Sequence, residues 1–211
     1  MTTYKHHVHY PDGYADDPDR RWPVLITLHG AGERNVPLAI LKNHHYYRPM
    51  YELTTSRYPM LVVLPLCPPR QYWEPPLMND LVNYLLRQEH IDEDRIYMNG
   101  FSMGGYGTWL TAGRYPDRFA AISPVCGGGD PRDASRLKDI PTWAFHGVQD
   151  PVVPVEETLS MIEAVTAAGG HPKVTIYAEG DHGVWDETYA NPELYEWFLQ
   201  HHRSERMPFA A

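Results

Sequence analysis

Short apolar runs recur along this chain, and helical patterns separate them. The runs cover residues 22–28, 61–66, 95–99, 119–125, 142–145 and 173–177. The clearest helical patterns cover residues 77–88, which carry an apolar stripe, and residues 155–168, which end at Gly169 and Gly170. Strands that alternate with helices predict a mostly parallel sheet with helices on both faces, because parallel neighbours need crossover connections. The predicted fold class is therefore α/β.

The remaining segments predict one further strand and no second domain. Residues 3–10, before the turn Pro11-Asp12-Gly13, are expected to form an extra edge strand with antiparallel placement. The length of 211 residues is that of one ordinary domain, and no repeat or linker divides it, so residues 1–211 are expected to form a single domain. The connection between residues 125 and 142 has room only for a short helix, which predicts an open cleft without a large lid domain.

The sharpest motif is Gly100-Phe101-Ser102-Met103-Gly104, which lies between the run at 95–99 and a helical pattern. In that context G-x-S-x-G marks a nucleophile elbow. Such a turn strains the serine backbone, and the residues two before and two after it must lack side chains. Gly100 and Gly104 meet that need, so we expect Ser102 to be a nucleophile. Alone, the motif is also compatible with an ordinary glycine-rich turn.

Two further residues follow in the order nucleophile, acid, histidine. Asp150 comes after the run at 142–145, and His182 lies on the loop after the run at 173–177. Taken singly, Asp150 is compatible with a helix cap and His182 with a surface histidine. Together with Ser102 they favour the α/β-hydrolase fold, with His182 as the general base and Asp150 orienting its imidazole.

The segment His29-Gly30-Ala31-Gly32-Glu33-Arg34 follows the run at 22–28 and predicts a tight turn. The backbone N–H of Ala31, or alternatively of Gly32, is expected to form an oxyanion hole with the N–H of Met103. His29 precedes Ser102 in the chain, so we expect it to support the turn. We expect a similar structural role for His146.

With these motifs the sequence closely resembles α/β-hydrolase esterases grouped with feruloyl esterases, polyhydroxybutyrate-depolymerase-like enzymes and predicted peptidases. The resemblance covers nearly the whole chain. It rests on HGAGER at 29–34, Cys67-Pro68 with Trp73, Asp94-Arg95-Ile96-Tyr97 before GFSMGGYGTW, PDRFAA at 116–121, Cys126-Gly127-Gly128-Gly129, and Phe145-His146-Gly147 leading to Asp150. It implies the same triad and oxyanion hole, and it places Trp73 and Trp185 near the cleft. Asn35 and Leu66 depart from residues frequent in the family, glycine and a polar residue such as glutamine. The resemblance places both near the acyl or alcohol pocket.

Trp73, Trp185, Phe101 and Met103 predict aromatic and flexible apolar walls, suited to hydroxycinnamoyl or short aliphatic acyl groups. The alternative is that both tryptophans pack in the core. We therefore predict a serine carboxylic-ester hydrolase that acts through an acyl-enzyme on small or aromatic, feruloyl-like esters, with polyester ends as a further substrate. Two alternatives remain open: a serine peptidase, and a catalytically silent hydrolase fold that serves as a binding protein.

Composition and charge exclude several classes of partner. The net charge of −9 would repel nucleic acid, and the 15 tyrosines indicate a tyrosine-rich surface or cleft. No apolar run reaches the roughly 20 residues of a membrane-spanning helix.

Cys67 and Cys126 are expected to be packed thiols, and the histidine pairs lack ligand spacing, so we expect no metal or other cofactor. The first residues lack a signal-peptide pattern, which predicts a cytoplasmic protein, or a secreted one if an export signal precedes residue 1. The sequence leaves the oligomeric state open.

Overall fold

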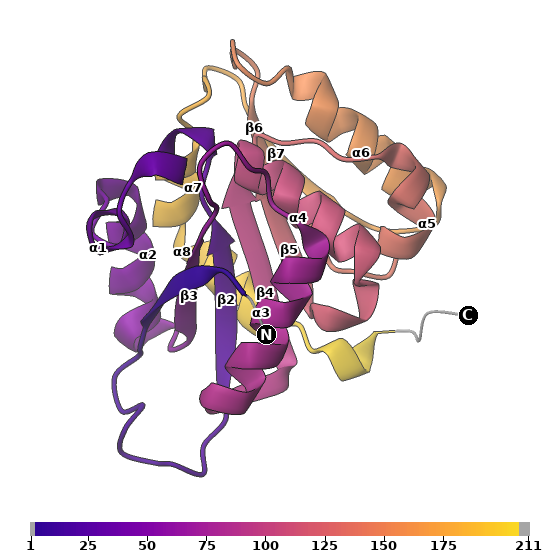
Figure 1. Ribbon diagram of the computed structural model, residues 1–211. Coiled ribbons are helices and arrows are strands. Elements are labelled where there is room, and N and C mark those ends of the chain that lie inside the picture. Colours follow the sequence, from indigo (N-terminus) through magenta and orange to yellow (C-terminus); the bar gives the residue numbers. More distant parts are fainter. Residues whose placement is uncertain (1–2, 207–211) are drawn as a thin grey trace.

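A computed structural model describes residues 3–206. Its centre is a seven-stranded sheet in the order β1-β3-β2-β4-β5-β6-β7 (Figure 1). The strands are β1 (Lys5–His9), β2 (Trp22–Leu28), β3 (Leu61–Leu66), β4 (Ile91–Phe101), β5 (Ala121–Val125), β6 (Trp143–Gly147) and β7 (Lys173–Tyr177). Strand β1 is antiparallel to β3 at one edge, and all other neighbours are parallel. The predicted α/β fold and the antiparallel edge strand are confirmed.

Helices cover both faces of the sheet (Figure 1). They are α1 (Leu38–Leu41), α2 (Arg48–Glu52), α3 (Pro75–Gln88), α4 (Met103–Arg114), α5 (Ala134–Leu137), α6 (Val155–Ala167), α7 (Trp185–Ala190) and α8 (Pro192–Leu199). Residues of α3 to α6 pack in one hydrophobic cluster, and residues of α1, α2, α7 and α8 pack in another. Only α5 and a short 3-10 turn lie between β5 and β6, so that connection holds no lid.

Strand residues alternate between the two clusters, as the pleat of a sheet requires. In β2, Val24 and Ile26 join the cluster under α3 and α4, whereas Leu25 joins the cluster under α7 and α8. In β3, Val63 and Val62 divide in the same way. The central strands are therefore buried on both faces, which explains why they read as continuous apolar runs and not as alternating ones.

The segment between β2 and β3 contains structure that the sequence patterns did not predict. Besides α1 and α2 it holds the 3-10 turns η1 (Ala31–Asn35) and η2 (His45–Tyr47) and the π-helix η3 (Leu53–Arg57). Each element is too short to produce a recognisable helical period. Packing fixes them instead, because Leu41, Tyr47 and Met50 are fully buried against the sheet.

The direction in which successive strands are added reverses at β2. From β2 the chain first crosses to β3 on one side and then returns through α3 to β4 on the other side. In open parallel sheets such a reversal separates the loops that follow the two neighbouring strands, and ligands bind there. The loop that begins at His29 and the elbow at Ser102 follow the two strands at this point, β2 and β4.

Two smaller expectations concern the thiols and membrane insertion. Cys67 and Cys126 are free and buried, as expected. Within residues 3–206, no helix has both the length and the apolar character needed to cross a membrane.

The packing of α3 makes a prediction about stability. Leu81 on α3 is fully buried, whereas Leu110 on α4 is 44% exposed. Leu81→Ala should lower the free energy of unfolding by about 2–5 kcal/mol, because it leaves a cavity in the core. The matched variant Leu110→Ala should change it by about 0.5 kcal/mol or less. Urea unfolding measures both, and equal losses would contradict the described packing.

Candidate active site

Ser102 lies in a strained turn between β4 and α4. Its backbone angles are φ 55° and ψ −121°, a conformation that residues with side chains rarely adopt. A β carbon at Gly100 would lie 2.5 Å from the carbonyl oxygen of Gly104, and one at Gly104 would overlap the carbonyl of Leu28. The two glycines therefore permit the close approach of β4, α4 and the end of β2, as the motif predicts.

The structure brings the three predicted triad residues into one hydrogen-bonded line. His182 Nε2 lies 2.9 Å from Ser102 Oγ, and His182 Nδ1 lies 2.7 Å from Asp150 Oδ2. Asp150 Oδ2 can only accept, so Nδ1 carries the hydrogen and Nε2 is free to accept the serine proton. The His182 side chain is 17% exposed and that of Asp150 is fully buried. This is the arrangement needed to activate a serine hydroxyl.

Several hydrogen bonds hold the Asp150 carboxylate. Burial alone would raise the pKa of Asp150, but bonds from His182 and from the backbone N–H groups of Val153 and Val152 lower it below its usual value. The two backbone donors lie 2.9 Å and 2.8 Å from Oδ1. Asp150 therefore stays ionised beside the His182 imidazole.

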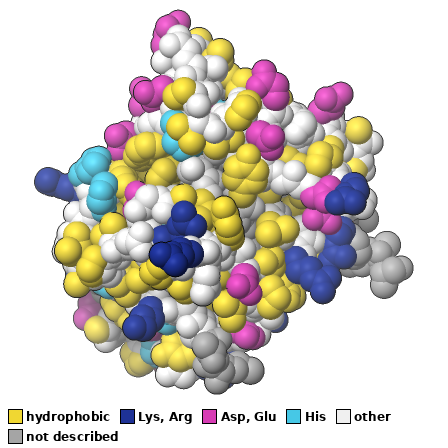
Figure 2. Space-filling model, turned by 45° about the horizontal axis from the view of Figure 1, so that its top comes forward, with side chains coloured by type: hydrophobic (Ala, Val, Ile, Leu, Met, Phe, Trp, Pro, Cys, Tyr) yellow, Lys and Arg dark blue, Asp and Glu magenta, His cyan; other side chains and the backbone are white. Residues whose placement is uncertain are grey.

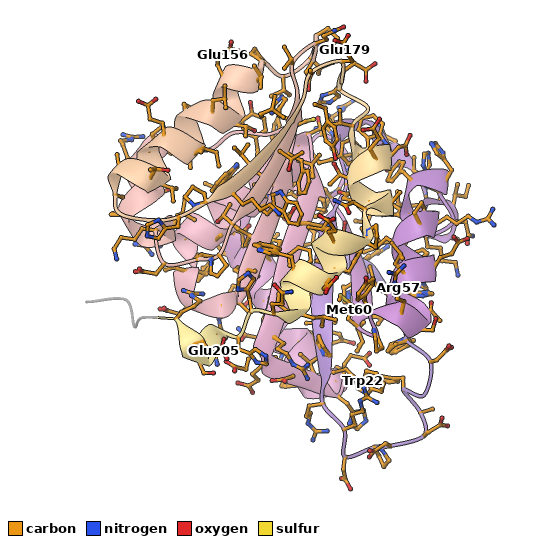
Figure 3. All side chains as sticks on the ribbon, turned by 180° about the vertical axis from the view of Figure 1, so that it is seen from behind. Trp22, Arg57, Met60, Glu156, Glu179 and Glu205 are labelled. Atoms are coloured by element: carbon orange, nitrogen blue, oxygen red, sulfur yellow. The ribbon has the colours of Figure 1, made fainter. Side chains whose placement is uncertain are left out.

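The loops that carry Asp150 and His182 touch at a glycine. A β carbon at Gly147 would lie 2.5 Å from the carbonyl oxygen of Asp181, and Gln149 N donates to the carbonyl of Gly180 at 2.9 Å. Figure 3 shows Glu179, just before the histidine loop, at the end of the molecule opposite Trp22, where β2 begins. Gly147 thus allows the two loops to meet at the carboxyl end of the sheet.

The two expected oxyanion donors begin short helical segments on either side of the elbow. Met103 is the first residue of α4, and Ala31 is the first residue of η1. The first N–H groups of a helix have no intrahelical partner. Because β2 and β4 are neighbours, both segments begin at the same end of the sheet. The placement is compatible with an oxyanion hole made of these two N–H groups.

His29 supports the loop that carries Ala31. Its Nδ1 lies 2.7 Å from the carbonyl oxygen of Gly30, and its Nε2 accepts the backbone N–H of Cys67 at 3.0 Å. One ring nitrogen therefore donates and the other accepts, which requires a neutral imidazole. Burial lowers the pKa of His29 to about 4. As expected, this histidine ties the end of β2 to the end of β3.

Trp73 lies beneath the same loop. It is 3% exposed, and its Nε1 donates to the carbonyl of His29 at 3.1 Å. Its ring packs edge-on against Tyr4 and His29, and Gly107 on α4 leaves room for it. These contacts favour a supporting role over the substrate contact that the sequence suggested. They match the core-packing alternative.

Trp185 lies beside the triad. Its ring is 5.9 Å from the His182 ring and 4.5 Å from that of Phe101, measured between centroids. Tyr46 of η2 packs edge-on against both Phe101 and Trp185. An aromatic wall thus borders His182, and Tyr46 is a member that no sequence motif identifies.

An apolar hollow lies on the side of the elbow where α4 begins. It has a volume of about 370 Å³ and is lined by Tyr72, Met103 and Tyr106. Figure 2, in which the top of Figure 1 comes forward, shows hydrophobic side chains across the middle of this face. Tyr106 lies within the motif GFSMGGYGTW, whereas the only sequence signal for Tyr72 is the high tyrosine count.

A second hollow of about 440 Å³ lies at the sheet edge between β1 and the loop after β3, and its lining includes Tyr4, Leu66 and Leu77. No triad residue lines it. Leu66, which we expected near the acyl or alcohol pocket, therefore faces a different hollow from the one beside Met103.

Among residues 3–206, one group of side chains has the composition of a metal site. Ligand atoms of Cys126, His146 and Asp150 lie within 4.8 Å of one another. Asp150 is hydrogen-bonded to His182, and both ring nitrogens of His146 face protein oxygens. The histidine pairs near both ends of the chain are not part of this group.

Comparisons with known proteins agree with this fold and site. A solved thermostable esterase superposes with a TM-score of 0.82 and is 34% identical over 93% of this chain and 59% of its own. Poly(3-hydroxyalkanoate) depolymerase C of Paucimonas lemoignei is 28% identical over 62% of this chain and 31% of its own length. A feruloyl esterase module from Clostridium thermocellum, complexed with sinapinate, superposes with a TM-score of 0.72 at 17% identity over 90% of this chain and 82% of its own. The chain spans less than two thirds of the first two relatives.

The sheet, the elbow and these likenesses define an α/β-hydrolase, and the expected resemblance to α/β-hydrolase esterases is confirmed. The Dienelactone hydrolase family matches residues 71–195, more than half of the chain. The protein therefore belongs to the dienelactone hydrolase family.

His29 makes a prediction about stability and pH. Its pKa is about 4 in the folded protein, against 6.5 in an unperturbed histidine. Between these values the unfolded chain binds more protons, so the contribution of His29 to stability is complete above pH 6.5 and is lost as the pH falls toward 4. Wild type should lose up to about 1.4 kcal/mol per pH unit more than His29→Gln over this range. Urea unfolding from pH 7 to 5 measures the slopes, and equal slopes would contradict a buried neutral His29.

Proposed function

We propose that this protein is a serine carboxylic-ester hydrolase that works through an acyl-enzyme. The observation that carries the proposal is the unbroken line from Ser102 Oγ to His182 at 2.9 Å and from His182 to Asp150 at 2.7 Å. Membership of a hydrolase family and likeness to esterases support the reaction class. Serine catalysis in particular rests on the geometry of these three side chains.

In the proposed reaction, Ser102 Oγ attacks the ester carbonyl carbon while His182 Nε2 takes its proton. The N–H groups of Met103 and Ala31 stabilise the oxyanion, and losing one such donor typically costs about 3–4 kcal/mol. Collapse of the intermediate breaks the bond to the alcohol, which receives the proton from His182. Water, deprotonated by His182, then attacks the acyl carbon, and His182 returns the proton to Ser102 Oγ as the bond between the serine and the acid breaks.

We propose small or aromatic esters as substrates. Trp185 borders His182, and Met103, the neighbour of Ser102 in the chain, lines an apolar hollow with Tyr72 and Tyr106. Both places offer aromatic surface to flat apolar groups. The connection between β5 and β6 holds no lid, which favours soluble esters or the exposed end of a polyester over a long-chain lipid. The feruloyl esterase module has the same fold, and hydroxycinnamoyl esters therefore belong in the test.

Ser102→Ala should abolish ester hydrolysis while leaving the fold intact. The expected loss in kcat/KM is on the order of 10⁴-fold or more, because only binding and the oxyanion hole remain. Purified proteins would be assayed on p-nitrophenyl esters and methyl hydroxycinnamates. The matched variant Ser160→Ala, at an exposed position on α6, should keep wild-type activity. Equal ester turnover by wild type and Ser102→Ala would refute the nucleophile.

A comparison of ester and amide substrates distinguishes the proposed esterase from the peptidase alternative. An amide needs protonation of a poorer leaving group, and peptidases usually add an extended peptide-binding surface. We expect p-nitroanilides to be turned over far more slowly than the matching p-nitrophenyl esters. Comparable turnover of both would favour a peptidase.

A further inference from the structure

Beneath the triad, a second histidine contacts Asp150. His146 lies at the end of β6, is fully buried, and places Nε2 3.3 Å from Asp150 Oδ2, the same oxygen that His182 contacts. Its Nε2 also lies 2.9 Å from the carbonyl oxygen of Val153, and its Nδ1 lies 2.8 Å from Thr158 Oγ1 on α6. Asp150 therefore lies between two imidazoles.

The hydrogen-bond partners determine where hydrogens lie on His146. Thr158 Oγ1 donates its single hydrogen to the buried carbonyl of Gly127 at 2.7 Å, so toward His146 Nδ1 it can only accept. A carbonyl oxygen also only accepts, so Nε2 must donate to Val153. Turning the threonine hydroxyl toward His146 instead would deprive the Gly127 carbonyl of this donor inside the protein, which is costly.

The charge of Asp150 also favours a hydrogen on both ring nitrogens of His146. The Asp150 side chain is fully buried, and a buried carboxylate is costly unless an opposite charge or several donors compensate it. In the resting triad His182 must be neutral in order to accept the serine proton. His146 is then the group in contact with Asp150 that can carry a positive charge.

We propose that His146 carries a hydrogen on both ring nitrogens and is a buried imidazolium that balances the charge of Asp150. It touches neither Ser102 nor the hollow and is a positioning residue, which acts on the triad through the carboxylate. The positive charge adds to the backbone donors that already keep Asp150 ionised, and it opposes protonation of His182 on the other side of the carboxylate. His182 thereby remains an available base at lower pH. This proposal deepens the proposed function and rests on the roles given there to Asp150 and His182.

The other titratable groups near Asp150 and His146 add no positive charge. Burial strongly raises the pKa of the Cys126 thiol, so it is neutral. Burial raises the pKa of Tyr106 to about 12, with Glu157 and Asp150 adding to the shift, so this phenol is neutral as well. Glu157 on α6 lies beside Tyr106 and Gly128, and Asp181 lies near Cys126. These last two are acidic and favour a cation at His146.

Nuclear magnetic resonance tests the proposal without any assay of activity. In protein labelled with ¹⁵N in histidine, correlations from the carbon-bound ring hydrogens report whether each nitrogen carries a hydrogen. At pH 8 we expect one histidine to be doubly protonated, and His146→Gln should remove that signal. If His146→Gln does not fold, Thr158→Val should shift the signal and lower the pH at which it loses a hydrogen, whereas Thr158→Ser should preserve it. A His146 with one ring hydrogen at pH 8 would overturn the proposal.

A pH profile tests the effect on the triad. The kcat/KM of His146→Gln should fall at higher pH than that of wild type, with the acidic limb moved upward by about one to two pH units, because the unbalanced carboxylate retains a proton on His182. Thr158→Ser should keep the wild-type limb. Loss of activity with an unmoved limb would mean a merely structural role and overturn the electrostatic one. If wild type hydrolyses no ester, the proposed function fails, and the resonance experiment still decides the state of His146.

Discussion

The site depends on the close contact between the start of α4 and the ends of β2 and β4. Side chains at positions 100 and 104 would fill that contact, and the two glycines keep it open. The approach turns Ser102 into its strained conformation and brings the first N–H of α4 to the same sheet end as the loop after β2. The position of the proposed nucleophile and those of its candidate oxyanion donors thus result from one packing constraint, at the point where the strand order reverses.

Polar contacts beneath the site keep its parts in place. His29 and Trp73 hold the loop after β2 from below, through bonds to Gly30, Cys67 and the His29 carbonyl. Gly147 lets the histidine loop lie against the acid loop. None of these groups takes part in the proposed chemistry, yet each fixes a distance on which that chemistry depends.

The sequence predicted the parts of the molecule that repeat or that obey a strict local rule. Buried strands such as β2 and β3 appear as apolar runs, and the elbow appears as glycines at fixed positions around Ser102. The short helices between β2 and β3 could not be predicted, because packing and not periodicity determines them. The wall residues Tyr46 and Tyr72 reach the site from loops whose paths no motif encodes. Trp73 shows the same limit: the sequence left both the cleft and the core open for it, because no local rule determines where a loop tryptophan points, and the structure buries it in the core.

Reaction with an active-site fluorophosphonate most directly tests whether the fold activates Ser102. The reagent needs a nucleophilic serine with a base in line, and it does not depend on the identity of the ester. We expect one covalent adduct per chain on Ser102, located by peptide mass spectrometry. The adduct should form in folded protein and fail to form in urea. An adduct on another residue, or no adduct in the folded protein, would contradict the account.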